Sequence, residues 1–390
     1  LYWFMQRTLS SRPPTVATEP VDEHTLPERG KYTFEISGHR LRIPVWPLGA
    51  AVFFLISFYG LMGYLIYPHF YPVQGFEARN VPGLFLNGDS LAPLPMLMRS
   101  LSITFGLGIG IGVTKTLGNI ERRRAEEKLE RIESQFPNAL FELGNKISGG
   151  TPIELGLEEA AESTSELEIS ELFEEASENV REMGMTFEDA IFDDQYGALR
   201  EFPSQMIKTV MKAILESSEK GTKMASTAMM TISRYLKNIH QTQETLNDLM
   251  EDTTTTIQLL AYMLAPVISG VAVGMSQTLI TALYSLSSRF NQTQSNLPGS
   301  GTSQLGGTGI LKNLNDAIPP EMLQFVIGFY LIQLLWLLGI FYMKITEGDD
   351  KTYRNLFTGK ILISGLFFYS ITLIIVSLLF GGIVSSIGSI

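Results

Sequence analysis

Five long runs of apolar residues dominate the pattern of hydrophobic and polar positions along the chain. They cover residues 47–67, 94–117, 253–288, 322–343 and 361–390, and only the second contains charged side chains, Arg99 and Lys115, near its ends. A helix needs about 20 apolar residues to cross the hydrocarbon core of a bilayer. Burial inside a soluble protein would explain one such run but not five. We therefore predict an all-α integral membrane protein with about five transmembrane helices.

The polar stretches between these runs set the expected domains. These are a cytoplasmic N-terminal segment or linker (1–46), two spans with an outer loop (47–118), a cytoplasmic helical bundle (119–256), and three spans with a Gly-, Ser- and Asn-rich outer loop (257–390). Residues 291–293, Asn-Gln-Thr, form a glycosylation sequon at Asn291 in that last loop. This sequon lies on the predicted outer face, so we expect Asn291 outside the cell, where a surface loop can be glycosylated.

The distribution of Lys and Arg predicts the orientation in the membrane. Residues 1–46, 119–256 and 344–360 carry six, fourteen and four of them, whereas the loops 68–93 and 288–321 carry one and two. Loops enriched in Lys and Arg stay in the cytoplasm. We therefore place the N-terminus and the polar domain in the cytoplasm, and five spans then leave the C-terminus outside.

Residues 119–256 are rich in helix start and stop signals and lack strand signals. The expected helix-opening residues are Pro137, Thr151, Ser165, Thr186 and Pro203, and the expected helix-ending residues are Gly149, Gly150, Gly184 and Gly221. Thr151 and Ser165 each begin a capping-box pattern with an acidic residue three positions later. Glycine is favoured just beyond a helix because it adopts left-handed backbone angles. The pattern predicts about six helices.

Composition excludes most catalytic chemistry. The chain has no Cys and four scattered His residues, so it carries no disulfide framework and no zinc-ribbon spacing. Its net charge of −11 argues against a nucleic-acid partner. A phosphate-binding loop of the form G-x-x-x-x-G-K-[ST] is absent from the sequence. We expect no catalytic residue, no metal site and no cofactor, and we interpret the helically spaced Glu174, Glu178 and Glu182 as a solvated face.

Glycines recur inside two of the predicted spans. They are Gly106, Gly108, Gly110 and Gly112 in the second span, and Gly270 and Gly274 in the third. The first set does not match a nucleotide-binding G-x-x-G spacing because position 111 is Ile. Glycines four residues apart let a neighbouring helix approach closely. We therefore expect these six residues at helix–helix contacts.

Other unusual residues in the spans are few. Pro266 is expected to kink the third span, and Gln277 and Gln333 are expected to form hydrogen bonds between helices. Mid-membrane charge, which ion-coupled transporters usually need, is absent from the predicted spans.

Charge is unevenly divided within the polar domain. Residues 154–201 hold 16 acidic and two basic side chains, whereas residues 202–240 hold six basic and two acidic ones. Four of the basic residues, Lys208, Lys212, Lys220 and Lys223, lie close together in the sequence. Two interpretations remain open. The opposite charges neutralise each other within the bundle or across a dimer, or the lysines form a docking surface for a charged cytoplasmic partner.

Several motifs resemble the F domain of type II secretion systems. A charged extension of a membrane helix leads to the segment FPNALFEL at 136–143, followed by GGTPIELGL at 149–157, GMTFEDAI at 184–191 and EKGT at 219–222. Pro137, Gly149, Gly150, Gly184 and Gly221 would occupy the turns of that domain. The layout is similar to that of the platform proteins of archaella and archaeal type IV pili over roughly residues 95–390. Gly156 departs from the family pattern, which has Ala there.

The resemblance implies a membrane platform without enzymatic activity. Such proteins, expected to be homodimers in contact with membrane lipid, sit at the base of a filament. A separate hexameric secretion ATPase engages their cytoplasmic domain, and pilin or archaellin subunits are inserted into the filament. Residues 1–46 would then be the linker to a further F-like domain. The alternative is a small-molecule transporter or channel, which should show interrupted paired spans and buried charge.

Overall fold

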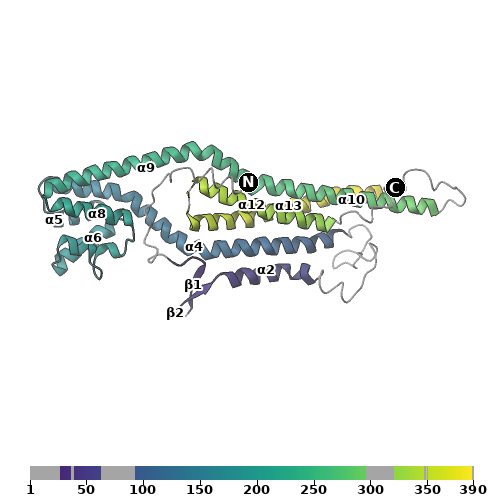
Figure 1. Ribbon diagram of the computed structural model, residues 1–390, viewed down its shortest axis with the longest axis horizontal. Helices are drawn as coiled ribbons and strands as arrows, with labels where there is room; N and C mark the ends of the chain where they lie inside the picture. Colours follow the sequence, from purple (N-terminus) through teal and green to yellow (C-terminus); the bar gives the residue numbers. More distant parts are fainter. Residues whose placement is uncertain are drawn as a thin grey trace. The chain divides into compact units, whose positions relative to one another are not determined.

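The computed structural model describes residues 27–36, 39–62, 93–295, 320–346, 348 and 350–388. These residues are mostly helical (Figure 1). Four helical stretches are long and apolar enough to cross a membrane: Met98–Ser148, Thr222–Ile280, Met322–Thr346 and Lys351–Phe380. The prediction of a helical, multi-pass membrane protein is confirmed at this level, but the number of five spans is not.

The remaining predicted span, 47–67, corresponds to helix α2 (Trp46–Leu61), which is 16 residues long. Residues 63–67 lie outside the described residues. The helix nevertheless has the surface of a membrane segment, because Phe54, Leu55 and Phe58 are 63%, 78% and 63% exposed. Large apolar side chains at this exposure indicate contact with lipid or with another protein.

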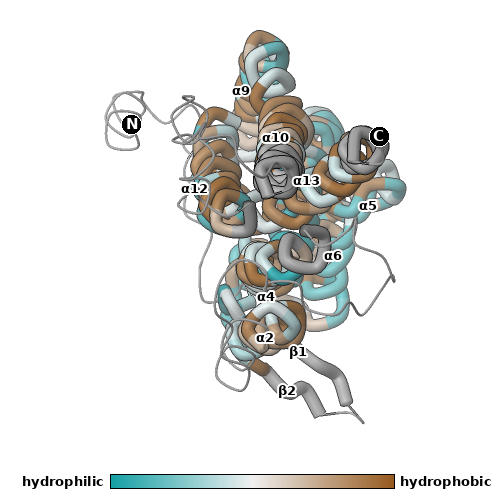
Figure 2. The backbone as a smooth tube through the Cα atoms, turned by 90° about the vertical axis from the view of Figure 1, so that its right-hand side faces the viewer, coloured by the Kyte–Doolittle hydropathy of each residue, from teal (hydrophilic) through white to brown (hydrophobic). Residues whose placement is uncertain are grey.

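The chain folds as two compact units. The polar unit contains residues 27–29 and 120–252, and the apolar unit contains the described residues between 30 and 119 and from 253 onward. Two helices contribute to both units: α4 (Pro93–Ser148) and α9 (Thr222–Leu259). In Figure 2 the coloured parts of helices α10 and α12 of the apolar unit are mostly brown, which marks hydrophobic residues.

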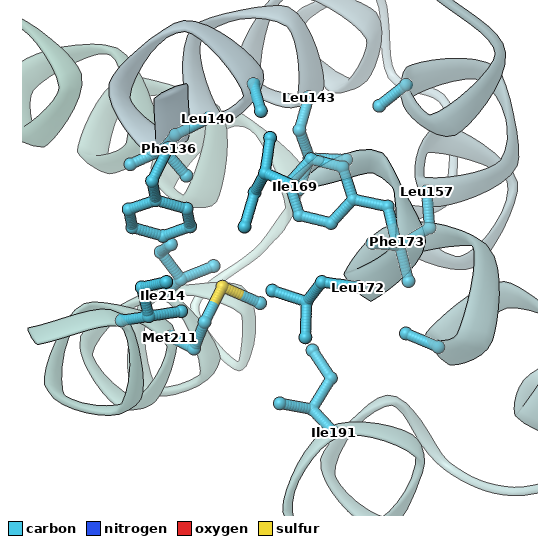
Figure 3. Close-up of a cluster of buried hydrophobic side chains, with 14 of the residues drawn as sticks. Phe136, Leu140, Leu143, Leu157, Ile169, Leu172, Phe173, Ile191, Met211 and Ile214 are labelled. Atoms are coloured by element: carbon cyan, nitrogen blue, oxygen red, sulfur yellow. The ribbon is translucent and has the colours of Figure 1, made fainter. Parts of the chain in front are cut away.

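The polar unit packs the end of α4, the start of α9 and four α-helices between them around one core. The intervening helices are α5 (Ile153–Ser163), α6 (Ser170–Met183), α7 (Phe187–Phe192) and α8 (Gln205–Ser218), with a 3-10 turn η3 (Ala198–Arg200). Apolar side chains at helical spacing converge from α4, α5, α6, α7 and α8 (Figure 3). Phe136, Leu140 and Phe173 are fully buried there. Burial of each such side chain stabilises the fold by about 1.5–3 kcal/mol.

Some of the expected helix boundaries in this unit are confirmed. Gly184 ends α6 in the left-handed conformation with φ of 67°, and the Thr186 hydroxyl accepts a hydrogen bond from the Asp189 backbone N–H at the start of α7. Gly221, with φ of 107°, separates α8 from α9. These sites are locally encoded, because glycine alone tolerates the left-handed region without strain.

Three expected helix starts are wrong. Pro137 lies inside α4, where its carbonyl accepts a hydrogen bond of 2.6 Å from the Ser233 hydroxyl. The predicted caps Thr151 and Ser165 do not cap, because α5 begins at Ile153 and α6 begins only at Ser170. A capping box is a local signal, and here the core positions of the helices override it.

A short β-hairpin precedes α2 and was not expected from the sequence. Strands β1 (Lys31–Ile36) and β2 (His39–Pro44) pair antiparallel, with Lys31 opposite Pro44. The Gly30 backbone N–H donates to the Gly118 carbonyl of α4 at 2.8 Å, and the Val45 N–H donates to the Gly30 carbonyl at 2.9 Å. These bonds fix the hairpin to the apolar unit.

The apolar unit consists of α2, the first part of α4, the end of α9, and three more helices: α10 (Ala265–Ser295), α12 (Pro320–Thr346) and α13 (Lys351–Gly388). Its core includes the fully buried Leu335, Leu366 and Tyr369. Because α10 continues to Ser295, Asn291 lies in a helix and not in the predicted outer loop. Residues 296–319 of that loop lie outside the described residues.

A π-helical turn lies directly before Pro266, the residue at which the sequence predicts a kink. Turn η4 (Leu260–Leu264) joins α9 to α10, and the Ala265 backbone N–H donates to the Leu260 carbonyl, five residues earlier. Proline has no N–H and its ring collides with the carbonyl four residues before it in a regular α-helix. The wider turn relieves both problems without breaking the helix.

Candidate docking surface

The predicted lysines lie on two successive helices of the polar unit. Lys208 and Lys212 are in α8, and Lys223 is in the first turn of α9. Helix α8 buries Ile207, Met211 and Ile214 in the core, so the positions of the two lysines face away from it. Lys220 lies in the turn between the helices, where Gly221 supplies the left-handed residue. We call Lys208, Lys212, Lys220 and Lys223 the lysine surface.

The start of α8 is held in place from a distant part of the sequence. The Ser204 hydroxyl accepts a hydrogen bond from the Ile207 backbone N–H at 3.2 Å and donates one to the Glu133 carboxylate of α4 at 2.5 Å. An N-cap of this kind stabilises a helix by about 1 kcal/mol. The contact therefore fixes the helix that carries Lys208 and Lys212 against α4.

All four side chains of the lysine surface are exposed. None of their ammonium groups forms an ion pair with any residue that the structure describes. Two acidic residues of α5 have other partners: Glu158 pairs with Arg181 of α6 at 3.0 Å, and Glu159 pairs with Lys146 at 3.7 Å. The structure thus gives no support to the interpretation that these lysines neutralise the acidic segment, residues 154–201, within the bundle.

Carboxylates lie close together within the acidic segment. Partial burial raises the pKa of the Glu175 carboxyl above its usual range, and the nearby carboxylates of Glu201 and Glu178 raise it further, against the lowering effect of Arg200. Glu174, Glu178 and Glu182 are all exposed, as expected of a solvated face. Among the described residues, no group of three or more His, Asp or Glu side chains could hold a metal ion.

The other two basic residues of this region differ from the lysine surface. The Lys237 ammonium lies 5.4 Å from the ring centroid of Phe141 in α4, a cation–π contact. Arg234 is exposed one turn earlier on α9. Both residues lie well along α9, whereas Lys223 is at its first turn.

The predicted turn residues serve as connections in the polar unit. Gly149 and Gly150 follow α4, with Gly150 at φ of 93° and its N–H donating to the Ile147 carbonyl at 2.9 Å. Gly184 ends α6, and Gly221 precedes α9. Pro137 is the exception, because it lies within a helix.

The glycines of α4 contact different helices on its two sides. Gly106 and Gly110 face α2: Gly106 lies against Ser57, and a Cβ built at Gly110 would lie 2.9 Å from the Gly49 carbonyl oxygen. Gly108 lies against Leu366 of α13, and a Cβ at Gly112 would lie 3.1 Å from the Gly359 carbonyl oxygen. Close approach on both sides is possible only because these residues lack side chains.

Gly270 and Gly274 of α10 face α13. A Cβ at Gly270 would lie 2.9 Å from Thr372 Cβ, and one at Gly274 would lie 2.5 Å from Val376 Cγ1. Gln277 is buried one turn further along α10, whereas Gln333 is exposed on α12. In the described part of α12, Gln324 forms an interhelical hydrogen bond, its Oε1 accepting from the Ser100 hydroxyl of α4. Nothing in the residues around Gln324 distinguishes it from Gln333 before the fold is known.

No family model, no curated protein and no solved structure matches this chain.

Proposed function

We propose that this chain is a membrane platform without enzymatic activity, which receives a cytoplasmic secretion ATPase and couples it to the assembly of an archaellum or type IV pilus-like filament. In this proposal the N-terminus and the polar unit face the cytoplasm, the C-terminus lies outside, and the protein acts as a homodimer in the cell membrane. Pilin or archaellin subunits are the cargo. The similarity of its motifs to the F domain supplies the class of partner.

The observation that carries the proposal is the lysine surface. Four exposed ammonium groups without ion-pair partners in the described structure are solvated by water, and they attract an acidic protein surface over about a Debye length, near 8 Å at physiological salt. Such charges steer encounter and select the partner. The exposed side chain of Met224 beside Lys223 adds an apolar contact to the same surface.

A charge-reversal experiment tests the docking surface. The variant Lys208→Glu/Lys212→Glu is expected to weaken binding of the purified hexameric ATPase to the detergent-solubilised full chain at least tenfold at low salt, with a smaller difference at high salt because salt screens the attraction. Filament assembly in cells should stop while the amount of protein in the membrane is unchanged.

The matched control is Arg234→Glu/Lys237→Glu, which changes the net charge equally in the same unit but outside the lysine surface. It should leave ATPase binding within about twofold of wild type. Melting temperatures of both variants check folding, since loss of exposed charges costs at most about 0.5 kcal/mol and loss of the contact between Lys237 and Phe141 costs about 0.5–1 kcal/mol. A folded Lys208→Glu/Lys212→Glu protein that still binds the ATPase and builds filaments would remove the proposal.

A further inference from the structure

The π-helical turn η4 is held on one side by polar and aromatic contacts. The Gln258 side-chain amide, two residues before η4, donates a hydrogen bond of 2.7 Å to the Tyr342 hydroxyl near the end of α12. Tyr342 stacks on Phe357 of α13, with ring centroids 4.2 Å apart and planes at 15°. Tyr262, within the turn, meets the same Phe357 ring edge-on at 6.0 Å. We call Gln258, Tyr262, Tyr342 and Phe357 the clamp.

The small residues of the turn allow this close packing. Ala261 is fully buried and Ala265 is 9% exposed, so α12 and α13 approach the helix backbone on the clamped side. On the other side Leu259 and Met263 are 59% and 55% exposed. The turn is therefore restrained on one side only, and its other side is covered by no described element.

The hydrogen bond that closes η4 joins residues five positions apart, whereas a regular α-turn joins residues four positions apart. Pro266 keeps it in this state, because in a regular α-helix the proline ring would collide with the Tyr262 carbonyl. Helix α10 beyond the turn is fixed against α13 through Gly270 and Gly274. A change from π to α geometry would therefore move the preceding helix, α9, and not α10.

We propose that η4 and its clamp form a two-position hinge through which the end of α9 (residues 253–259, in the apolar unit) turns relative to α10. The inference rests on the proposed function, since α9 begins at the lysine surface and a docked motor would act on it. Conversion to α geometry rotates this end of α9 by about 100° and shifts it by about 1.5 Å along the helix axis. A register change of one residue is a small movement. Side chains packed around a helix allow only discrete positions, so such a movement switches the helix between two states.

The size of the movement makes it measurable. A side chain about 5 Å from the helix axis moves by about 8 Å when the helix rotates by 100°. The chain has no native Cys, so spin labels can be attached at Thr255→Cys in α9 and Lys351→Cys in α13. Both positions are exposed and both belong to the apolar unit. Pulsed electron resonance on the full chain in lipid nanodiscs then reports the distance between the labels.

Three substitutions are expected to shift this distance. Tyr342→Phe removes the acceptor for Gln258 but keeps the ring stack, and a second distance several ångströms away should appear. Gln258→Leu breaks the same hydrogen bond from the other side and should give the same second distance. Pro266→Ala restores the backbone N–H, and together with Tyr342→Phe it should move most of the population to the new distance. Tyr330→Phe is the control, because Tyr330 is 59% exposed on the same helix α12.

The outcomes separate the hinge from the docking proposal. The second distance in both clamp variants, enriched by Pro266→Ala and absent from Tyr330→Phe, supports the hinge whether or not the lysine variants affect ATPase binding. A single wild-type distance in the folded Pro266→Ala/Tyr342→Phe protein overturns the hinge, even if charge reversal abolishes ATPase binding. Gel filtration and melting temperature establish that each variant is folded.

Discussion

Substitution of Gly274 by Ala tests the contact between α10 and α13 most directly. The new Cβ would lie 2.5 Å from Val376 Cγ1 and 2.8 Å from Val376 Cβ. Carbon atoms pack comfortably at about 3.5–4.0 Å. The helices must therefore separate by about 1 Å, or Val376 must leave its position, and both responses loosen the packing around Leu373 and Val376 on the same face of α13.

The expected cost follows from these distances. Overpacking by one methyl group in a tight contact destabilises a protein by about 1–3 kcal/mol. Ala is favoured over Gly in a helix by up to about 1 kcal/mol, which partly offsets that cost. We expect a net loss of about 1–2 kcal/mol in the free energy of unfolding. The double variant Gly270→Leu/Gly274→Leu should separate the two helices while the protein still inserts into the membrane.

Equilibrium unfolding in mixed detergent micelles measures the change, with the helix signal followed as denaturing detergent is added. Gly149→Ala is the control, because a Cβ at Gly149 meets no atom within 4 Å. It should change the free energy of unfolding by no more than about 0.5 kcal/mol. If Gly274→Ala and Gly149→Ala unfold at the same detergent concentration as wild type, the close approach of α10 to α13 is wrong.

Three further predictions concern charge, topology and catalysis. Because the folded-state pKa of Glu175 is raised, ionisation of its carboxyl destabilises the fold at neutral pH. Glu175→Gln should therefore raise the melting temperature at pH 7, and this gain should vanish toward pH 4. An equal gain at both pH values would contradict the prediction. A Cys at Ser295 should react with an impermeant thiol reagent in intact cells and a Cys at Ser148 should not, and the reverse pattern would invert the proposed orientation. Purified protein without its ATPase partner should neither bind nor hydrolyse ATP, and stoichiometric nucleotide binding would contradict the platform proposal.

The membrane character and several helix ends were determined by the sequence alone. A run of 20 or more apolar residues is unfavourable in water and is long enough to cross a bilayer as a helix. The long apolar helices of the apolar unit were therefore predictable. Gly184 and Gly221 were predictable as helix boundaries because left-handed backbone angles are a property of single residues. The exposure of Lys208 and Lys212 follows from the spacing of the apolar residues of α8.

Contacts between residues far apart in the chain were decided only by the tertiary structure. Pro137 signals a helix start locally, but in the structure it lies within α4, where its carbonyl accepts a hydrogen bond from Ser233. Pro266 predicted a kink, whereas the π geometry and the bond between Gln258 and Tyr342 depend on residues 84 positions apart. Local patterns encode neighbours three or four residues away along a helix. They do not encode which other helix packs against a given position, or which of its faces makes the contact, because both depend on how all the apolar surfaces are buried together.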